Sequence, residues 1–446
     1  MYQIKKLKSG AKYIKIQKSD DLSVGLLILC HVGSQDEEPH EYGMSHFLEH
    51  MVFKGTKNYP NPLIIKEKLD QMGAEYNAFT DKNVTGYHVK VAKRHSSKAM
   101  DILIEMVTQA KLRKKDMDME KRVVIEEFNQ VMDNPIRALF EHATQVAFEG
   151  TKLQHPTIGY VDVIQNYTNK DLKKYYKKHY RKDNMTISVS GDISKTLENK
   201  IFKHFGKPDK TKMKTEKVES SRLSNLCFTD NLFKFKGIPK KIKMFTKKTK
   251  KQYIILDKRN MTQSNILITF KIPGMKHQSK YVINVLKQLM AGSMSSRLFQ
   301  LLREKWGLVY TVQTELIQYE EHGCFAIYAG TETKNCKKVI KLIINEINKL
   351  KTKMVKKTEL KKILDSIRGS LALENEDNIT LASYYGLQCL LDMDIKTIND
   401  LIDKEYTPNK ITQKKLKKIV ETYFNYDNML ITVMGNHKLS DFKNII

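Results

Sequence analysis

The sequence predicts an α+β protein made of two similar halves. Strand-like segments precede helix-like segments in the first half, and the same order begins again in the second. The segment "DNMTISVSGD" at 183–192 is matched by "DNMLITVMGN" at 427–436, which indicates an internal repeat. An order of strands, then helices, then a strand favours a mostly antiparallel sheet covered by helices on one side. We therefore expect homologous domains over residues 1–205 and 253–446, joined by a lysine-rich linker at 206–252.

Alternation and apolar spacing predict the elements of the first half. Runs rich in β-branched and aromatic residues predict strands, while apolar residues spaced three or four apart predict helices. The predicted strands cover 11–17, 24–34, two paired segments within 74–92, and 184–192. The predicted helices cover the stretch that begins near residue 44, then 61–73, several segments within 96–149, and 168–178.

The second half begins its own cycle after the linker. "SNILITFKIPG" at 264–274 predicts a strand, and "YVINVLKQLMAG" at 281–292 predicts an apolar helix. The segment at 206–252 has many lysines and little periodicity, which is typical of a solvated linker.

Composition restricts the class of protein. The net charge of +28 comes from lysines spread along the whole chain, without one basic stripe interleaved with aromatic residues, so a nucleic-acid partner is not expected. The five cysteines form no CxxC pair, which fits a reducing compartment. No window holds the roughly 18 uninterrupted apolar residues of a membrane span. We expect a soluble, intracellular, cytoplasmic protein with no membrane partner.

The stretch "MSHFLEHMVFKGT" at 44–56 contains a candidate zinc site. On a helix, His46 and His50 lie one turn apart on the same face, so both imidazoles can bind one ion. Glu49 lies on the same side, where a carboxylate can act as a general base without being a ligand. The order H-x-x-E-H inverts the commoner H-E-x-x-H, although three fixed positions in five also arise by chance.

A third ligand is sought in the helical segment at 116–135, which offers the adjacent carboxylates Glu126 and Glu127. Glu127 has valines at its i−4, i−3 and i+4 positions and is expected to face the apolar interior, where a metal ion compensates its charge. Glu120 lies two turns earlier on the same face. It is either a supporting carboxylate that orients a ligand or an exposed glutamate near the start of the helix.

Three stretches resemble the insulinase, pitrilysin and mitochondrial processing peptidase family of zinc metallopeptidases. They are "GMSHFLEHMVFKGT", "MGAEYNAFTDKN" and "AGSMSSRLFQLLREKWGLVYTV", and a glutamate also follows the second histidine by 77 positions. The resemblance covers nearly the whole chain. It implies two halves that face each other across a cavity.

The resemblance also implies roles for individual residues. His46, His50 and Glu127 would bind one zinc ion, Glu49 would be the general base, and Glu120 would support the site. In the strand predicted at 74–80, Asn77 and Ala78 would pair with an extended peptide substrate. From the second half, Arg303 and Tyr310 would hold the substrate backbone, and Tyr310 would stabilise the developing oxyanion.

The expected function is that of a zinc endopeptidase acting on unfolded peptides. The second half lacks H-x-x-E-H, so one zinc ion per chain is expected. The resemblance implies assembly as a homodimer, with a heterodimer of related subunits as the other arrangement. The alternative function is a non-catalytic structural or partner subunit that keeps the peptidase fold.

Overall fold

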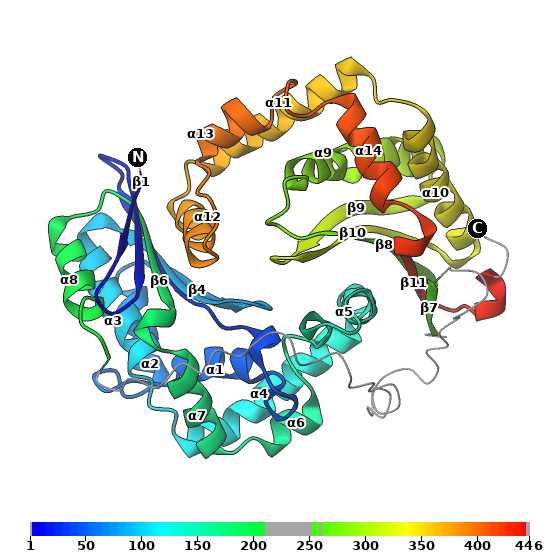
Figure 1. Cartoon of the computed structure of the whole chain (residues 1–446). Coiled ribbons are helices and arrows are strands. Elements are labelled where there is room, and N and C mark those ends of the chain that lie inside the picture. Colours follow the sequence, from blue (N-terminus) through cyan, green and yellow to red (C-terminus); the bar gives the residue numbers. More distant parts are fainter. Residues whose placement is uncertain (1, 210–251, 258–260, 443–446) are drawn as a thin grey trace.

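The computed structural model describes residues 2–209, 252–257 and 261–442, and Figure 1 shows its two sheets on opposite sides of the molecule. The first half contains six strands: β1 Tyr2–Lys6, β2 Lys12–Gln17, β3 Ser23–Cys30, β4 Glu75–Thr80, β5 Thr85–Ala92 and β6 Met185–Gly191. Its helices are α1 Met44–Val52, α2 Pro62–Asp70, α3 Ser96–Thr108, α4 Lys114–Asp133, α5 Pro135–Ala147, α6 Val161–Asn166, α7 Asn169–His179 and α8 Lys195–Phe205.

The second half repeats this plan with five described strands. They are β7 Gln252–Asp257, β8 Gln263–Pro273, β9 Val309–Gln318, β10 His322–Glu332 and β11 Met429–Gly435. The helices are α9 Lys280–Ala291, α10 Cys336–Thr352, α11 Lys357–Glu374, α12 Asn378–Leu390, α13 Ile398–Asp400 and α14 Gln413–Tyr423, with π-helical segments at Phe299–Lys305 (η6) and Leu401–Glu405 (η8).

The two sheets share one topology, which confirms the two-domain α+β prediction. Their strand orders are β1-β2-β6-β3-β5-β4 and β7-β11-β8-β10-β9. In each sheet one pair is parallel, β2 with β6 and β7 with β11, and the other described pairs are antiparallel. The strands predicted to repeat, β6 and β11, occupy equivalent positions beside β3 and β8.

The prediction that each sheet is covered on one side only is wrong, because each half places a helix on the other half's sheet. Along β3, Leu26 and Ile28 face the large core of the first half, whereas Leu27 and Leu29 pack with Ala382 of α12. In the second half, Leu267 of β8 packs with α5, while its neighbours face the core beneath α9 and α10. Figure 1 shows α12 against the first sheet and α5 against the second. Successive strand residues point to opposite faces, so both faces are buried.

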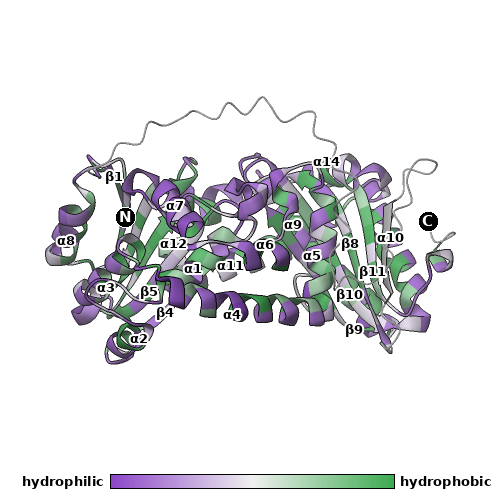
Figure 2. Ribbon diagram, turned by 90° about the horizontal axis from the view of Figure 1, so that it is seen from below, coloured by the Kyte–Doolittle hydropathy of each residue, from purple (hydrophilic) through white to green (hydrophobic). Residues whose placement is uncertain are grey.

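Some element predictions were incomplete. Strand β1 and helix α8 were not predicted, and the helical region expected at 96–149 is divided into α3, α4 and α5. Most of the predicted linker at 206–252 lies outside the described residues. Figure 2 shows α4 passing along the molecule from the first half toward α5.

None of the described helices has both the length and the apolar character needed to cross a bilayer.

Candidate metal centre and active site

Helix α1 carries the candidate site, and its start is fixed by a buried carboxylate. Gly43 at the N-cap has φ +95°, and a Cβ there would lie 2.7 Å from the carbonyl oxygen of Ile158. The side chain of Glu37 accepts hydrogen bonds from the backbone N–H groups of Gly43 and Ser45, both at 2.7 Å. Burial raises the pKa of Glu37 to about 8, and its carboxyl oxygens act here as acceptors for N–H groups that the first helical turn leaves free. Glu37 therefore fixes the direction in which α1 presents its histidines.

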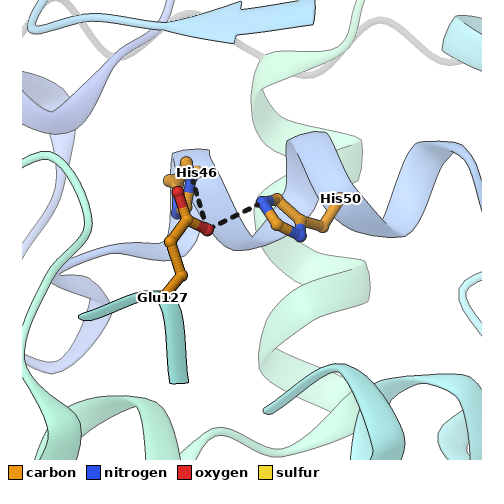
Figure 3. Close-up of side chains that lie close together, drawn as sticks. All are labelled: His46, His50 and Glu127. Carbon is orange, nitrogen blue, oxygen red and sulfur yellow. Dashed lines mark ion pairs between the residues drawn. The ribbon is translucent and has the colours of Figure 1, made fainter. Parts of the chain in front are cut away.

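Three side chains from α1 and α4 converge on one point, as Figure 3 shows. The Nε2 atoms of His46 and His50 lie 3.7 and 3.5 Å from Oε2 of Glu127. One possible ligand atom from each residue lies within 4.8 Å of the other two. A tetrahedral zinc ion with bonds of about 2.0–2.1 Å holds its ligand atoms about 3.4 Å apart, so two imidazoles and one carboxylate at these distances fit zinc.

The argument from burial that selected Glu127 was wrong, although the structure does place Glu127 beside the histidines. Its side chain is 41% exposed, and Val123 is exposed instead of packed in the interior. The buried carboxylate of α4 is Glu120, at 4% side-chain exposure, so it is not the exposed glutamate of the alternative. Glu126 is exposed. Glu127 lies at the boundary between core and solvent, where a ligand set with an open position has to be.

Glu120 supports His50. Its Oε1 lies 2.8 Å from Nδ1 of His50, and its Oε2 pairs with Nζ of Lys54. A histidine that binds metal through Nε2 usually donates its Nδ1–H to such a carboxylate, which sets the tautomer and the ring orientation. In contrast, the buried Nδ1 of His46 has no hydrogen-bond partner among the described residues.

The electrostatics of the site distinguish its two histidines. Burial, with a smaller contribution from His50, lowers the pKa of His46 to about 3, which favours the neutral imidazole that a metal requires. Burial also acts to lower the pKa of His50, but the hydrogen bond and charge of Glu120 outweigh it, so the pKa is raised. Burial acts to raise the pKa of Glu120, yet the hydrogen bonds with His50 and Lys54 lower it overall.

Glu49 lies on the same helix and is held by the neighbouring strand. Its Oε2 accepts a hydrogen bond of 2.6 Å from the hydroxyl of Thr80 at the end of β4. Burial raises the pKa of Glu49, although Thr80 and His50 act in the opposite direction. A carboxylate with a raised pKa suits general-base chemistry near neutral pH.

Strand β4 lies at an edge of the first sheet, as predicted for Asn77 and Ala78. It pairs with β5 on one side, and α1 packs beside it. The N–H of Ala78 donates to Oδ1 of its neighbour Asn77 at 2.9 Å. An added peptide strand would have to displace this local bond.

Arg303 and Tyr310 contact each other. Nη1 of Arg303 donates to the backbone oxygen of Tyr310 at 3.2 Å, and the guanidinium lies 5.0 Å from the Tyr310 ring centroid. Tyr310 is 82% exposed. Within the described part of the chain, no hydrogen bond or ion pair joins either residue to the candidate ligands or to Glu49. The structure therefore brings the two residues together but does not bring them into contact with the metal centre.

Sequence reasoning missed three residues that shape the site. They are Glu37, which caps α1, Lys54, which pairs with Glu120, and Thr80, which binds Glu49. Lys54 and Thr80 lie inside two of the stretches that resemble the peptidase family, so the signal was present without a role attached to it. The partners of these residues lie 6 to 66 positions away in the chain, and short sequence spacings do not predict such pairs.

Comparison with known proteins gives the family. Residues 13–160 match the model of the insulinase family (peptidase family M16), and residues 166–367 match that of the M16 inactive domain. A Bacillus subtilis protein named uncharacterized zinc protease YmxG is 29% identical over 416 residues, covering 93% of this chain and 94% of the relative. A Streptomyces coelicolor protein, also named an uncharacterized zinc protease, is 26% identical, and the match covers 86% of this chain and 80% of that relative.

Solved structures share the fold. A Helicobacter pylori protease has a TM-score of 0.80 at 22% identity and covers 97% of this chain and 99% of its own. A chain from complex III of Candida albicans has a TM-score of 0.78 at 15% identity, with 100% and 97% coverage. The cluster of His46, His50 and Glu127 is consistent with the zinc-protease names of the relatives. Together with the two family-model matches, it shows that the chain belongs to the insulinase (M16) peptidase family.

Proposed function

We propose that this chain is a zinc-dependent endopeptidase that cleaves unfolded peptides. The observation that carries the proposal is the convergence of His46, His50 and Glu127, with Glu49 on the same helix one turn from His46. Bound zinc supplies a Lewis acid that polarises the peptide carbonyl and acidifies water.

The residues of the chain position the substrate and move the proton. The edge of β4 at Asn77 and Ala78 binds the peptide as an added strand. Thr80 holds Oε2 of Glu49, which leaves Oε1 to take a proton from the attacking water and deliver it to the leaving nitrogen. Arg303 and Tyr310 contribute hydrogen-bond donors for the substrate backbone and for the developing oxyanion. The proposed working assembly contains two copies of the chain.

The substitution Glu49→Gln tests the proposal. It removes the base and keeps the size of the side chain, so hydrolysis of a quenched fluorescent peptide should fall by about 100- to 10,000-fold. Zinc content, measured by elemental analysis, should stay at one ion per chain because Glu49 is not a ligand. Glu127→Gln should lose zinc, whereas the exposed neighbour Glu126→Gln should keep both zinc and activity. A Glu49→Gln enzyme as fast as the parent would refute the proposed chemistry.

The second candidate function is a non-catalytic subunit. It is favoured by the inactive-domain match at 166–367 and by the likeness to a chain of complex III. If the chain is such a subunit, the parent protein should show no peptide hydrolysis even with zinc bound. A chelator should also leave its association with partner subunits unchanged. The same assay therefore separates the two functions.

A further inference from the structure

The loop between α1 and α2 contacts α4 beside the candidate metal centre. Lys54 follows the C-cap residue Phe53, and its ammonium group pairs with Oε2 of Glu120. The other oxygen of that carboxylate lies 2.8 Å from Nδ1 of His50. One buried carboxylate thus lies between a lysine and a candidate zinc ligand. Ionised hydrogen bonds of this kind are roughly twice as strong as neutral ones.

The backbone of Lys54 is held in place independently of its side chain. Nη2 of Arg113, at the N-cap of α4, donates to the carbonyl oxygen of Lys54 at 3.0 Å, and Nη1 donates to that of Pro60 at 2.9 Å. The next residue, Gly55, has φ +128°, and a Cβ there would lie 2.6 Å from the Pro60 oxygen. The path of this loop therefore brings Lys54 back toward α4.

The two histidines are supported unequally. Nδ1 of His50 has the Glu120 carboxylate, whereas Nδ1 of His46 is buried and has no partner in the described part of the chain. Among the described residues, the hydrogen bond to Glu120 is therefore the contact that orients the His50 ring through its Nδ1 atom. Any group that fixes Glu120 also fixes the direction of the His50 Nε2 atom.

We propose that Lys54 is a positioning residue for the metal centre, acting through Glu120 on His50. Lys54 holds Oε2 of Glu120 so that Oε1 stays aligned with the His50 ring. The inference rests on the metal site of the proposed function, and it concerns affinity for zinc instead of the hydrolytic step.

The test measures the dissociation constant for Zn²⁺ by competition with a chromophoric chelator on metal-stripped full-length protein. Lys54→Met and Lys54→Gln each remove the cation, and both should raise the constant by about 10-fold, the low end of the effect of losing a partner behind a metal ligand. Lys54→Arg should stay within about threefold of the parent because it restores a donor to Glu120. The matched control is Lys57→Met, at an exposed lysine of the same loop, which should leave the constant unchanged.

A double-mutant cycle separates positioning from a general effect on charge. If Lys54 acts through Glu120, then Lys54→Met or Lys54→Gln adds nothing in a Glu120→Gln background. Circular dichroism and melting confirm that each variant is folded, and having two substitutions at position 54 keeps the test decisive if one fails to fold. Parent-like zinc affinity in either folded variant would overturn the proposal, as would an effect that persists in the Glu120→Gln background.

Failure here is distinguishable from failure of the proposed function. The zinc titration uses no substrate. If the variants show the predicted order of zinc affinities but the parent shows no peptide hydrolysis, the Lys54 inference is supported and the peptidase function is refuted. Conversely, if peptide hydrolysis depends on Glu49 but zinc affinity is unchanged by substitution of Lys54, only the Lys54 inference is refuted.

Discussion

At the scale of single residues, three glutamates near the candidate site have the same side chain but different surroundings. Glu120 is buried between His50 and Lys54, Glu127 lies half-exposed beside both histidines, and Glu49 is held by Thr80. A buried carboxylate with two cationic or donor partners is suited to support, since its charge is already compensated. A half-exposed carboxylate can bind an ion that solvent also reaches.

Thr80 provides a test at the residue scale. Thr80→Val keeps the shape but removes the hydroxyl that donates to Glu49, so the carboxylate loses its fixed orientation. A hydrogen bond to a charged group contributes about 1.5–3 kcal/mol, and kcat for peptide hydrolysis should fall by about 10- to 100-fold with little change in KM. Thr80→Ser, which keeps the hydroxyl, is the control and should retain most of the activity. Equal kcat in the valine variant and the parent would show that Thr80 does not position the base.

At the scale of elements, α12 is fitted closely to the first sheet. Asn378, at its first turn, donates to the carbonyl oxygen of Ser23 at 2.9 Å and accepts from the hydroxyl of Ser190 at 3.0 Å. Ser188 donates to the carbonyl oxygen of Ala382 at 2.7 Å. These bonds satisfy polar groups that the contact buries, and small residues let the helix approach the strands.

Two helical glycines give a matched prediction about this contact. In α12, a Cβ on Gly386 would lie 2.9 Å from Cβ of Ser188, whereas a Cβ on the exposed Gly369 of α11 would meet nothing within 4 Å. Gly386→Ala should therefore lower the free energy of unfolding by about 1–3 kcal/mol through overpacking. Gly369→Ala should raise it by up to about 1 kcal/mol through helix propensity. Urea denaturation measures both, and a stabilising Gly386→Ala would contradict the close fit.

At the scale of the whole molecule, the two halves are interlocked by an exchange of helices. Helix α5 of the first half covers a face of the second sheet, and α12 of the second half covers a face of the first. Ion pairs cross the same boundary, including Lys90 with Asp377 and Lys12 with Asp392, both at 2.7 Å. Each half thus lacks part of its own core when it is alone.

Cleavage between the halves tests this interlock. A protease site inserted within 210–251 and cut after purification should give two fragments that still elute together in size exclusion, because the exchanged helices bury apolar surface on both sheets. The fragments should separate only in denaturant, and each expressed alone should be insoluble or unfolded. Two separate folded peaks under native conditions would show that the exchanged helices contribute little to holding the halves together.

Much of the fold and part of the site could be predicted from sequence because their signals are local. Periodicity located most of the strands, and the spacing of His46 and His50 on one helical turn predicted a shared face. The position of Glu127 around the helix axis was a less reliable guide to its burial, because neighbouring valines do not reveal which face of the helix is covered by another element. The phase argument expected Val123 to be buried, and the structure exposes it.

By itself, the sequence determined the α+β class, the internal repeat and the placement of two histidines and a glutamate on one helix, α1. Each of these can be read from patterns within short stretches of sequence. Only the tertiary structure decided the exchange of α5 and α12 and the buried position of Glu120. It also decided the contacts of Lys54 and Thr80 with the candidate site. Those contacts join segments far apart in the chain, and their geometry is set by how helices pack on sheets, which no local pattern encodes.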